Sequence, residues 1–224
     1  MTLDRRYRKL QEDIKAACGK AQRDVSELTL IAVTKYVTID ETKKVKALGI
    51  SDLGENRVKE AQEKIEAIKD VAWHFIGPLQ SRKVKEIAEK IDYFHALDRM
   101  KIAKELNKRR SSPLNCFIQV NISGEATKGG VEQEALQAFV ESLSSLENIR
   151  IVGLMTMAPH STDESLVRGV FKELRRCCDH IKSLELPHAP CDYLSMGMSN
   201  DFEWAILEGA THLRIGSTLV NPER

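Results

Sequence analysis

The sequence predicts a single-domain closed (β/α)8 TIM barrel with an extra amino-terminal helix. Short apolar runs alternate with longer segments of helical period, which is the pattern of parallel βαβ units. About eight such runs occur, the number that a closed barrel requires. No polar linker and no shift in composition divides the 224 residues. We therefore expect one domain over residues 1–224.

The expected strands are apolar along most of their length, as parallel strands covered by helices are. They are residues 28–35, 50–54, 71–77, 91–97, 114–122, 149–157, 191–197 and 211–216. An opening helix runs to about Ala21, and segments with apolar residues every three or four positions separate the strands. An open doubly wound sheet is the alternative. Polar residues at the carboxyl ends of nearly all the strands favour the barrel.

Composition excludes several classes of function. Lys and Arg number 34 against 33 Asp and Glu, so no basic excess exists to neutralise nucleic-acid phosphates or to anchor the chain on anionic lipid. No segment has the length of a membrane span or the apolar core of a secretory signal. Five cysteines without a CxxC pair are typical of free thiols in a reducing compartment. We expect a cytoplasmic protein without a metal site.

Two loops near the carboxyl end predict a phosphate site. In barrels of this type, phosphate is typically held after the seventh and eighth strands. The seventh strand leads through Ser195, Gly197 and Ser199 into a helical pattern, and the eighth ends in Gly216 and Ser217. Hydroxyls, glycine and the free N–H groups of a helix start can bind an anion. Each loop alone reads as a serine-capped helix start or an ordinary strand end, but the pairing favours phosphate.

Lys35 ends the first strand, so its amine is expected at the mouth of the barrel. A strand-end lysine usually extends to water. A partly buried lysine, however, can become a neutral amine that attacks an aldehyde. Closure of the barrel puts Arg214, on the eighth strand, beside the first. An aromatic aldehyde that carries phosphate would use the amine, the phosphate site and the guanidinium together.

Two further side chains lie at strand ends in the same layer. Asn56 follows the second strand and could cap the next helix or hydrogen-bond a ring hydroxyl of a ligand. Both alternatives stay open. His74 lies between Trp73 and Phe75, which favours a packed, hydrogen-bonded interior histidine over a general base.

Several segments, in order, resemble the pyridoxal phosphate homeostasis proteins, single-domain relatives of the amino-terminal barrel of alanine racemase. They are LIAVTKYV, LGENRVKEAQEK, WHFIGPLQSRK, FIQVNISGEATKGG, GLMTMAP and LSMGMSNDFEWAILEGATHLRIGS. The resemblance implies a fold like that of type III pyridoxal phosphate (PLP) enzymes. It also implies a Schiff-base lysine at Lys35, a phosphate site at Ser195, Gly197, Ser199, Gly216 and Ser217, Arg214 at the pyridine nitrogen, and Asn56 near the ring.

The resemblance further implies a protein that holds PLP and takes part in vitamin B6 and amino-acid homeostasis without robust catalysis. A guanidinium keeps the ring nitrogen unprotonated, which weakens the ring as an electron sink. The second base of alanine racemase is a tyrosine from another domain, and we expect this chain to lack it. PLP-dependent apo-enzymes would be partners, and the chain is expected to be a monomer.

Two alternatives remain: a PLP-dependent amino-acid racemase of low activity, and a Schiff-base aldolase acting on a sugar phosphate. A bare interaction module is the least favoured. The sequence departs from the family after Ser217, where an apolar residue, phenylalanine and glycine usually follow and this chain reads TLVNP. Different packing of the tail is the expected consequence.

Overall fold

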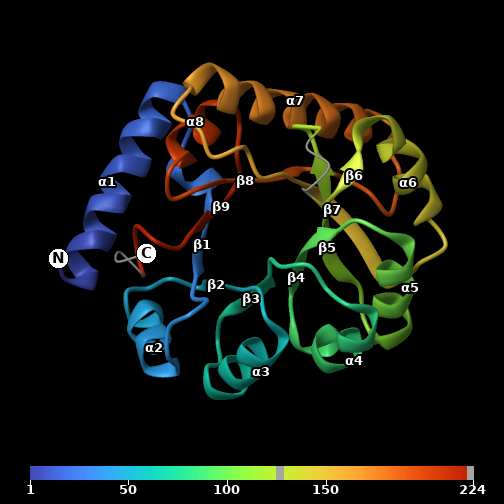
Figure 1. Ribbon diagram of the computed structural model, residues 1–224, viewed down its shortest axis with the longest axis horizontal. Coiled ribbons are helices and arrows are strands. Elements are labelled where there is room, and N and C mark those ends of the chain that lie inside the picture. Colours follow the sequence, from blue (N-terminus) through green and yellow to red (C-terminus); the bar gives the residue numbers. More distant parts are fainter. Residues whose placement is uncertain (125–128, 221–224) are drawn as a thin grey trace.

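The computed structural model describes residues 1–124 and 129–220 as a closed ring of parallel strands surrounded by helices (Figure 1). The barrel strands are β1 (Thr29–Val33), β2 (Asp52–Glu55), β3 (Ala72–Phe75), β4 (Tyr93–Leu97), β5 (Leu114–Asn121), β7 (Ile149–Met155), β8 (Tyr193–Met198) and β9 (His212–Ile215). They run in the order β4-β3-β2-β1-β9-β8-β7-β5, and β4 pairs with β5 to close the ring. The predicted (β/α)8 barrel is confirmed, and the open sheet is wrong. A short strand, β6 (Val131–Glu132), pairs with the end of β5.

Helices form the outer layer, as the 3.6-residue periodicity predicts. They are α1 (Leu3–Ala21), α2 (Ile39–Ala47), α3 (Val58–Ala67), α4 (Val84–Ile87), α5 (Met100–Arg109), α6 (Leu136–Ser142), α7 (Glu164–Ser183) and α8 (Phe202–Leu207). Short 3-10 segments cover Val25–Glu27, Ser81–Lys83, Ala88–Lys90 and Gln133–Ala135.

The amino-terminal helix completes the outer layer. It stands between α8 and α2 in the ring and packs against α8 (Figure 1). Its buried side chains recur every three or four residues, at Leu10, Ile14 and Ala17. The Nε atom of Arg6 donates a 2.7 Å hydrogen bond to the carbonyl of Leu219, which ties α1 to the segment that follows β9.

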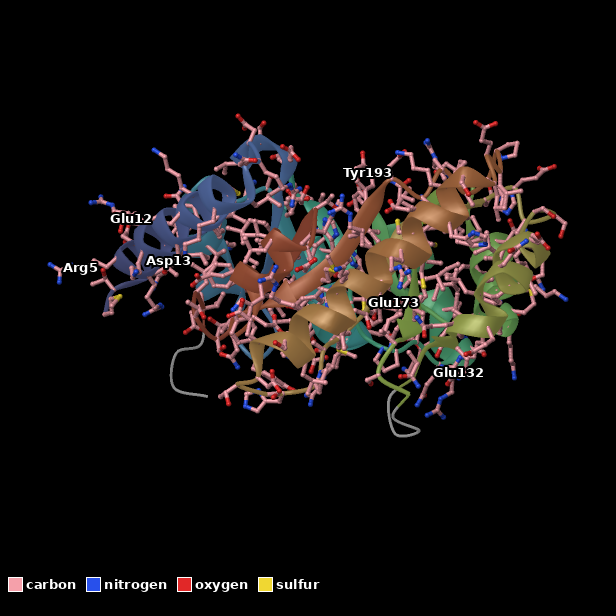
Figure 2. The ribbon with its side chains drawn as sticks, turned by 90° about the horizontal axis from the view of Figure 1, so that it is seen from above. Arg5, Glu12, Asp13, Glu132, Glu173 and Tyr193 are labelled. Atoms are coloured by element: carbon pink, nitrogen blue, oxygen red, sulfur yellow. The ribbon has the colours of Figure 1, made fainter. Side chains whose placement is uncertain are left out.

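Seen from the side, the barrel has two distinct ends. Figure 2 shows Tyr193, where β8 begins, and Glu132, where β6 ends, at opposite edges of the molecule. Charged side chains such as Glu12 of α1 and Glu173 of α7 lie on the outer helices (Figure 2). None of the described helices is both long enough and apolar enough to cross a bilayer. Within the same residues, no three His, Cys, Asp or Glu side chains gather as metal ligands.

The unusual tail is described only in part. Leu219 is fully buried, and the amides of Leu219 and Val220 donate to the carbonyl of Gly216 over 3.1 and 2.8 Å. The remaining departure, Asn221 and Pro222, lies outside the described residues, as do residues 125–128 of the family-like segment after β5.

The interior of the barrel is filled by aromatic and imidazole rings. His74 stacks on Tyr93 with centroids 4.4 Å apart and planes 1° from parallel. His95 stacks on Phe117 at 4.3 Å, and His212 meets the same Phe117 ring edge-on at 5.0 Å. Such rings fill the space that branched aliphatic residues usually fill in these barrels. The prediction that His74 is an interior, hydrogen-bonded residue agrees with its 1% exposure and its two hydrogen bonds.

Burial keeps these histidines neutral. It lowers the pKa of His74, although hydrogen bonding to Asp52 opposes the change. It also lowers the pKa of His95 well below the ordinary value, and that of His212 to about 3. Each imidazole therefore binds a proton in the unfolded chain at a pH where the folded barrel excludes it.

The neutral His212 predicts how stability changes with pH. Because its folded pKa is lowered, its contribution is fully present above about pH 6.5 and is lost as the pH falls toward 3. Wild type should lose unfolding free energy between pH 6.5 and 4.5, because its unfolded chain binds a proton at His212 and its folded chain does not. One such proton is worth about 1.4 kcal/mol per pH unit, so His212→Gln should lose about 2 kcal/mol less than wild type in urea unfolding. His180→Gln, at an exposed position on α7, is the control that keeps the wild-type slope. Equal slopes for His212→Gln and wild type would contradict this account.

Candidate functional site

Lys35 lies in a tight turn directly after β1. The amide of Val37 donates to the carbonyl of Thr34 over 3.2 Å, and Tyr36 has a φ of 71°. A tyrosine in this left-handed region is strained, so the surrounding structure must impose the turn. Lys35 is partly exposed, and its Nζ lies 5.6 Å from the centroid of the Tyr36 ring. The guanidinium of Arg57 lies 5.1 Å from the same ring.

A buried ion pair holds the start of this turn. The Nζ of Lys64, on α3, donates to Glu55 Oε1 and to the carbonyl of Thr34, both over 2.6 Å. The Thr34 hydroxyl donates to the same Glu55 oxygen over 2.7 Å. The side chains of Lys64 and Glu55 are only 4% and 2% exposed. The backbone from which Lys35 projects is therefore fixed by a charged group that water does not reach.

The two loops that the sequence assigns to phosphate meet. The amides of Gly216 and Thr218, after β9, donate to the hydroxyl oxygen of Ser199 over 3.3 and 3.2 Å. The Thr218 hydroxyl lies 3.4 Å from the carbonyl of Ser199. Ser217 lies between these two amides and is partly exposed. Converging backbone N–H groups of this kind are what an anion requires.

Gly197 allows the helix that follows β8 to approach closely. Its φ is 90°, and a Cβ at this position would lie 2.7 Å from the Cβ of Ala205 on α8. Asp201 fixes the intervening turn by accepting a 2.6 Å hydrogen bond from the amide of Met198. Any larger residue at position 197 would push α8 away from the loop that carries Ser199.

Arg214 points into the barrel. Its Nη1 donates to the Ser195 hydroxyl over 2.6 Å and its Nη2 donates to the carbonyl of Thr156 over 2.9 Å. Burial lowers the pKa of Arg214 to about 10, while the nearby Asp201 carboxylate acts in the opposite direction. Burial also raises the pKa of Asp201. Arg214 thus remains a cation at neutral pH, with two neutral acceptors holding its guanidinium.

Strand register brings the Lys35 turn and the loop after β9 together. Ile31 pairs with Arg214 and Ala32 with Ile215. A Cβ on Gly216 would lie 3.6 Å from the Cβ of Val33, two residues before Lys35. The lysine turn, the serine-glycine loops and the arginine strand therefore share one rim of the barrel.

Asn56 does not cap the next helix. The N-cap of α3 is Arg57, which makes no capping hydrogen bond through its side chain. The capping alternative is wrong. Asn56 Oδ1 is instead buried without a hydrogen-bond partner, and Gly77 packs so closely that a Cβ there would lie 2.6 Å from the Asn56 carbonyl. A buried amide oxygen without a partner is costly and marks a position where a ligand donor would fit.

Ser195 lies in the interior, away from the Ser199 contacts. It is fully buried, and its hydroxyl contacts Arg214 and His95. The reason is a register shift between β8 and β9, where Ser195 pairs with His212 but Met198 pairs with Arg214. Four residues of β8 thus lie opposite three of β9, which re-aims side chains as a β-bulge does. Ser195 and Ser199 consequently have different neighbours.

Sequence reasoning missed two residues that contact the predicted ones: Thr156 and His95. Thr156 contributes its backbone carbonyl just after a strand, which no residue pattern distinguishes. The sequence does contain a signal for His95. It lies two residues from Tyr93 and two from Leu97 on β4, and side chains at this spacing face the same side of a strand.

Comparison with known proteins gives the chain its family. The model of the alanine racemase N-terminal domain matches residues 9–222. The pyridoxal phosphate homeostasis protein of Aquifex aeolicus is 40% identical over 96% of this chain and 95% of its own length. The pyridoxal phosphate homeostasis protein of Pseudomonas aeruginosa is 39% identical over 97% of this chain and 94% of its own length. The chain belongs to the pyridoxal phosphate homeostasis protein family.

Solved structures agree with this assignment. An unknown protein from Bifidobacterium adolescentis is 31% identical with a TM-score of 0.90, over 97% of this chain and 93% of that one. PipY of Synechococcus elongatus with PLP bound is 28% identical with a TM-score of 0.84, over 98% of this chain and all of that one. Alanine racemase of Clostridium difficile, 12% identical with a TM-score of 0.73, shares the fold over 93% of this chain and 56% of its own.

The buried ion pair beneath the Lys35 turn predicts a large effect on stability. Lys64→Met leaves the Glu55 carboxylate buried and unpaired, which should cost about 3 to 5 kcal/mol of unfolding free energy in urea titrations. The double variant Lys64→Met, Glu55→Met removes both charges and should regain most of that loss. Lys90→Met is the control. Lys90 forms a 3.0 Å ion pair with Glu66, whose side chain is largely exposed, so this substitution should cost less than about 1 kcal/mol. A single variant as stable as this control would contradict the role of the pair.

Proposed function

We propose that this chain binds pyridoxal 5′-phosphate as a Schiff base on Lys35 and holds it in vitamin B6 and amino-acid homeostasis. The observation that carries the proposal is the shared rim of the Lys35 turn, the Ser199 loop and Arg214. The PLP-bound structure of PipY, similar over the whole chain, supports the choice of cofactor.

The chemistry of the donor set fits this cofactor. Two backbone amides already converge on the Ser199 hydroxyl, and a phosphate oxygen could accept from the same donors. Asn56 Oδ1 is buried without a partner, so a ring hydroxyl would supply the donor that it lacks. Arg214 is a buried cation inside the barrel, suited to hydrogen-bond an unprotonated pyridine nitrogen.

Each residue then has a separate task. Lys35 supplies the amine that condenses with the aldehyde carbon, with loss of water, and this covalent bond is the chemistry that the cofactor contributes. Gly197, Ser199, Gly216 and Ser217 hold the phosphate. We assign Ser195 to orienting Arg214, because its hydroxyl contacts that guanidinium and His95.

Holding is favoured over catalysis by the charge at the ring. A permanently charged guanidinium hydrogen-bonds the ring nitrogen without protonating it, so the ring withdraws electrons weakly. The cytoplasm as location, a monomeric state and delivery to PLP-dependent apo-enzymes belong to the same proposal. Scattered exposure of large apolar side chains, such as Val25, Leu166 and Tyr193, is consistent with a monomer.

Absorbance and trapping test the proposal directly. Purified protein incubated with PLP should show the absorbance of a Schiff base, and borohydride should leave one pyridoxyl group on the peptide that contains Lys35. Lys35→Ala should lose both signals, because the amine that the proposal assigns to the aldehyde is then absent. Lys43→Ala, at an exposed position on α2, is the control and should retain both signals.

The alternatives give different outcomes. Trapping by borohydride only with a sugar phosphate would favour the aldolase. Loss of optical activity from added alanine, dependent on Lys35, would favour the racemase. Label on peptides other than that of Lys35, at equal yield in the Lys35→Ala variant, would refute the proposal.

A further inference from the structure

A continuous line of hydrogen bonds crosses the interior of the barrel. Arg214 Nη1 donates to Ser195 Oγ over 2.6 Å, and Ser195 Oγ lies 2.8 Å from His95 Nδ1. His95 Nε2 lies 2.9 Å from His74 Nδ1, and His74 Nε2 lies 3.0 Å from Asp52 Oδ1. The line connects Arg214, whose guanidinium reaches the carbonyl of Thr156 just after β7, to Asp52, the first residue of β2.

Only one direction of donation satisfies every member. Both imidazoles are neutral, so each has one donor and one acceptor nitrogen. Burial favours protonation of Asp52, but hydrogen bonds from His74 and Ser51 outweigh burial and lower its pKa, so Asp52 is an acceptor at neutral pH.

The remaining roles follow in sequence. His74 must donate from Nε2 to the carboxylate and accept at Nδ1. His95 must then donate from Nε2 and accept at Nδ1. Ser195 must donate its only proton to His95, which leaves its oxygen to accept from Arg214.

Groups around the line do not interrupt it. Tyr93 stacks on His74, and Phe117 stacks on His95. His212 lies 6.3 Å from both histidine rings, centroid to centroid, and its own pKa of about 3 keeps it neutral. Asp92 also faces His74 electrostatically, but its Oδ2 accepts from the amide of Trp73 over 2.8 Å. Asp52 is therefore the anion at which the line ends.

We propose that Asp52, His74 and His95 are positioning residues, whose one-way hydrogen bonds commit the only proton of Ser195 to His95, so that the Ser195 lone pairs face the Arg214 guanidinium and orient it for the ring nitrogen. The cofactor part of this inference rests on the proposed function. The direction of the hydrogen bonds is independent of the proposed function, because it is a property of the chain without cofactor.

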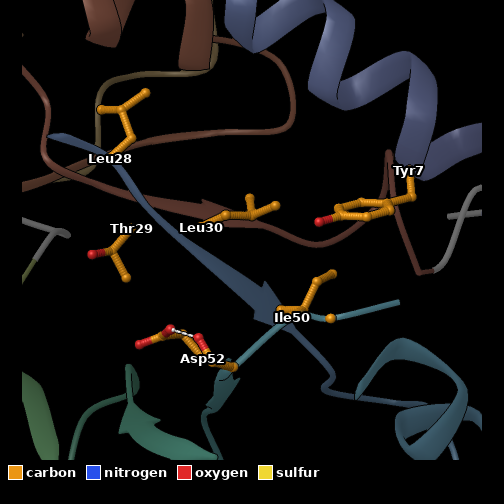
Figure 3. Close-up of a pocket in the computed structure, with 8 residues that line it drawn as sticks. Tyr7, Leu28, Thr29, Leu30, Ile50 and Asp52 are labelled. Atoms are coloured by element: carbon orange, nitrogen blue, oxygen red, sulfur yellow. Dashed lines mark hydrogen bonds between the residues drawn. The ribbon is translucent and has the colours of Figure 1, made fainter. Parts of the chain in front are cut away.

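Asp52 is the one member in contact with the outside at the far end. Its side chain is 20% exposed. It borders a cavity of about 310 Å³ between α1 and the starts of β1 and β2, shown in Figure 3 together with Tyr7 and Thr29. Its second oxygen accepts from the Ser51 hydroxyl over 2.6 Å. A ligand or solvent in this cavity can therefore change the charge of Asp52, and the line of hydrogen bonds carries the effect to Arg214.

Nitrogen NMR of the histidine rings tests the direction in cofactor-free protein. In wild type at neutral pH, His74 and His95 should both be Nε2–H tautomers. Asp52→Asn nearly preserves shape, but its amide can donate as well as accept, so the one-way constraint is lost. The ring nitrogens of His95, which does not contact Asp52, should then shift together with those of His74. Asp70→Asn removes the same charge from a side chain that is 92% exposed and should shift neither.

Cofactor binding supplies the second readout. With PLP labelled at its ring nitrogen, Asp52→Asn should move that resonance and weaken binding roughly tenfold, the effect of about one hydrogen bond. Asp70→Asn should do neither. An Nδ1–H tautomer in wild type, or an unmoved His95 in Asp52→Asn, would overturn the inference. If wild type binds no PLP, the proposed function fails, and the tautomers still decide the direction of the line.

Discussion

The burial of one guanidinium inside a closed barrel is the constraint on which the interior depends. Arg214 is 5% exposed, and an unpaired charge in such surroundings would be prohibitively unfavourable. Ser195 and Thr156 accept from it, and Asp201 lies near enough to favour its charge. These contacts replace the water that the arginine loses and make its position a fixed property of the fold.

Most of the fold was predictable from the sequence because strand and helix periods differ clearly. The position of Lys35 just past the first strand was predictable because the apolar run of β1 ends at Val33, two residues before it. The position of the Ser195 side chain was harder to predict, since strict alternation along a strand puts Ser195 and Ser199 on the same face. The register shift between β8 and β9 separates them, and local residue preferences do not encode such a shift. The contact of His95 with Ser195 depends on closing a ring between residues 100 positions apart.

The ends of a barrel are usually assigned different roles, with function at the carboxyl ends of the strands and stability at the amino ends. Here the line of hydrogen bonds from Asp52 to Arg214 connects the two ends. The same polar side chains that fill the interior also determine which way Ser195 can donate. Reversing one link would leave two donors or two acceptors facing each other, so the links can reverse only together. The charged Asp52 carboxylate can only accept, so it permits one direction alone, and for this reason the charge on Asp52 matters at a rim that it does not touch.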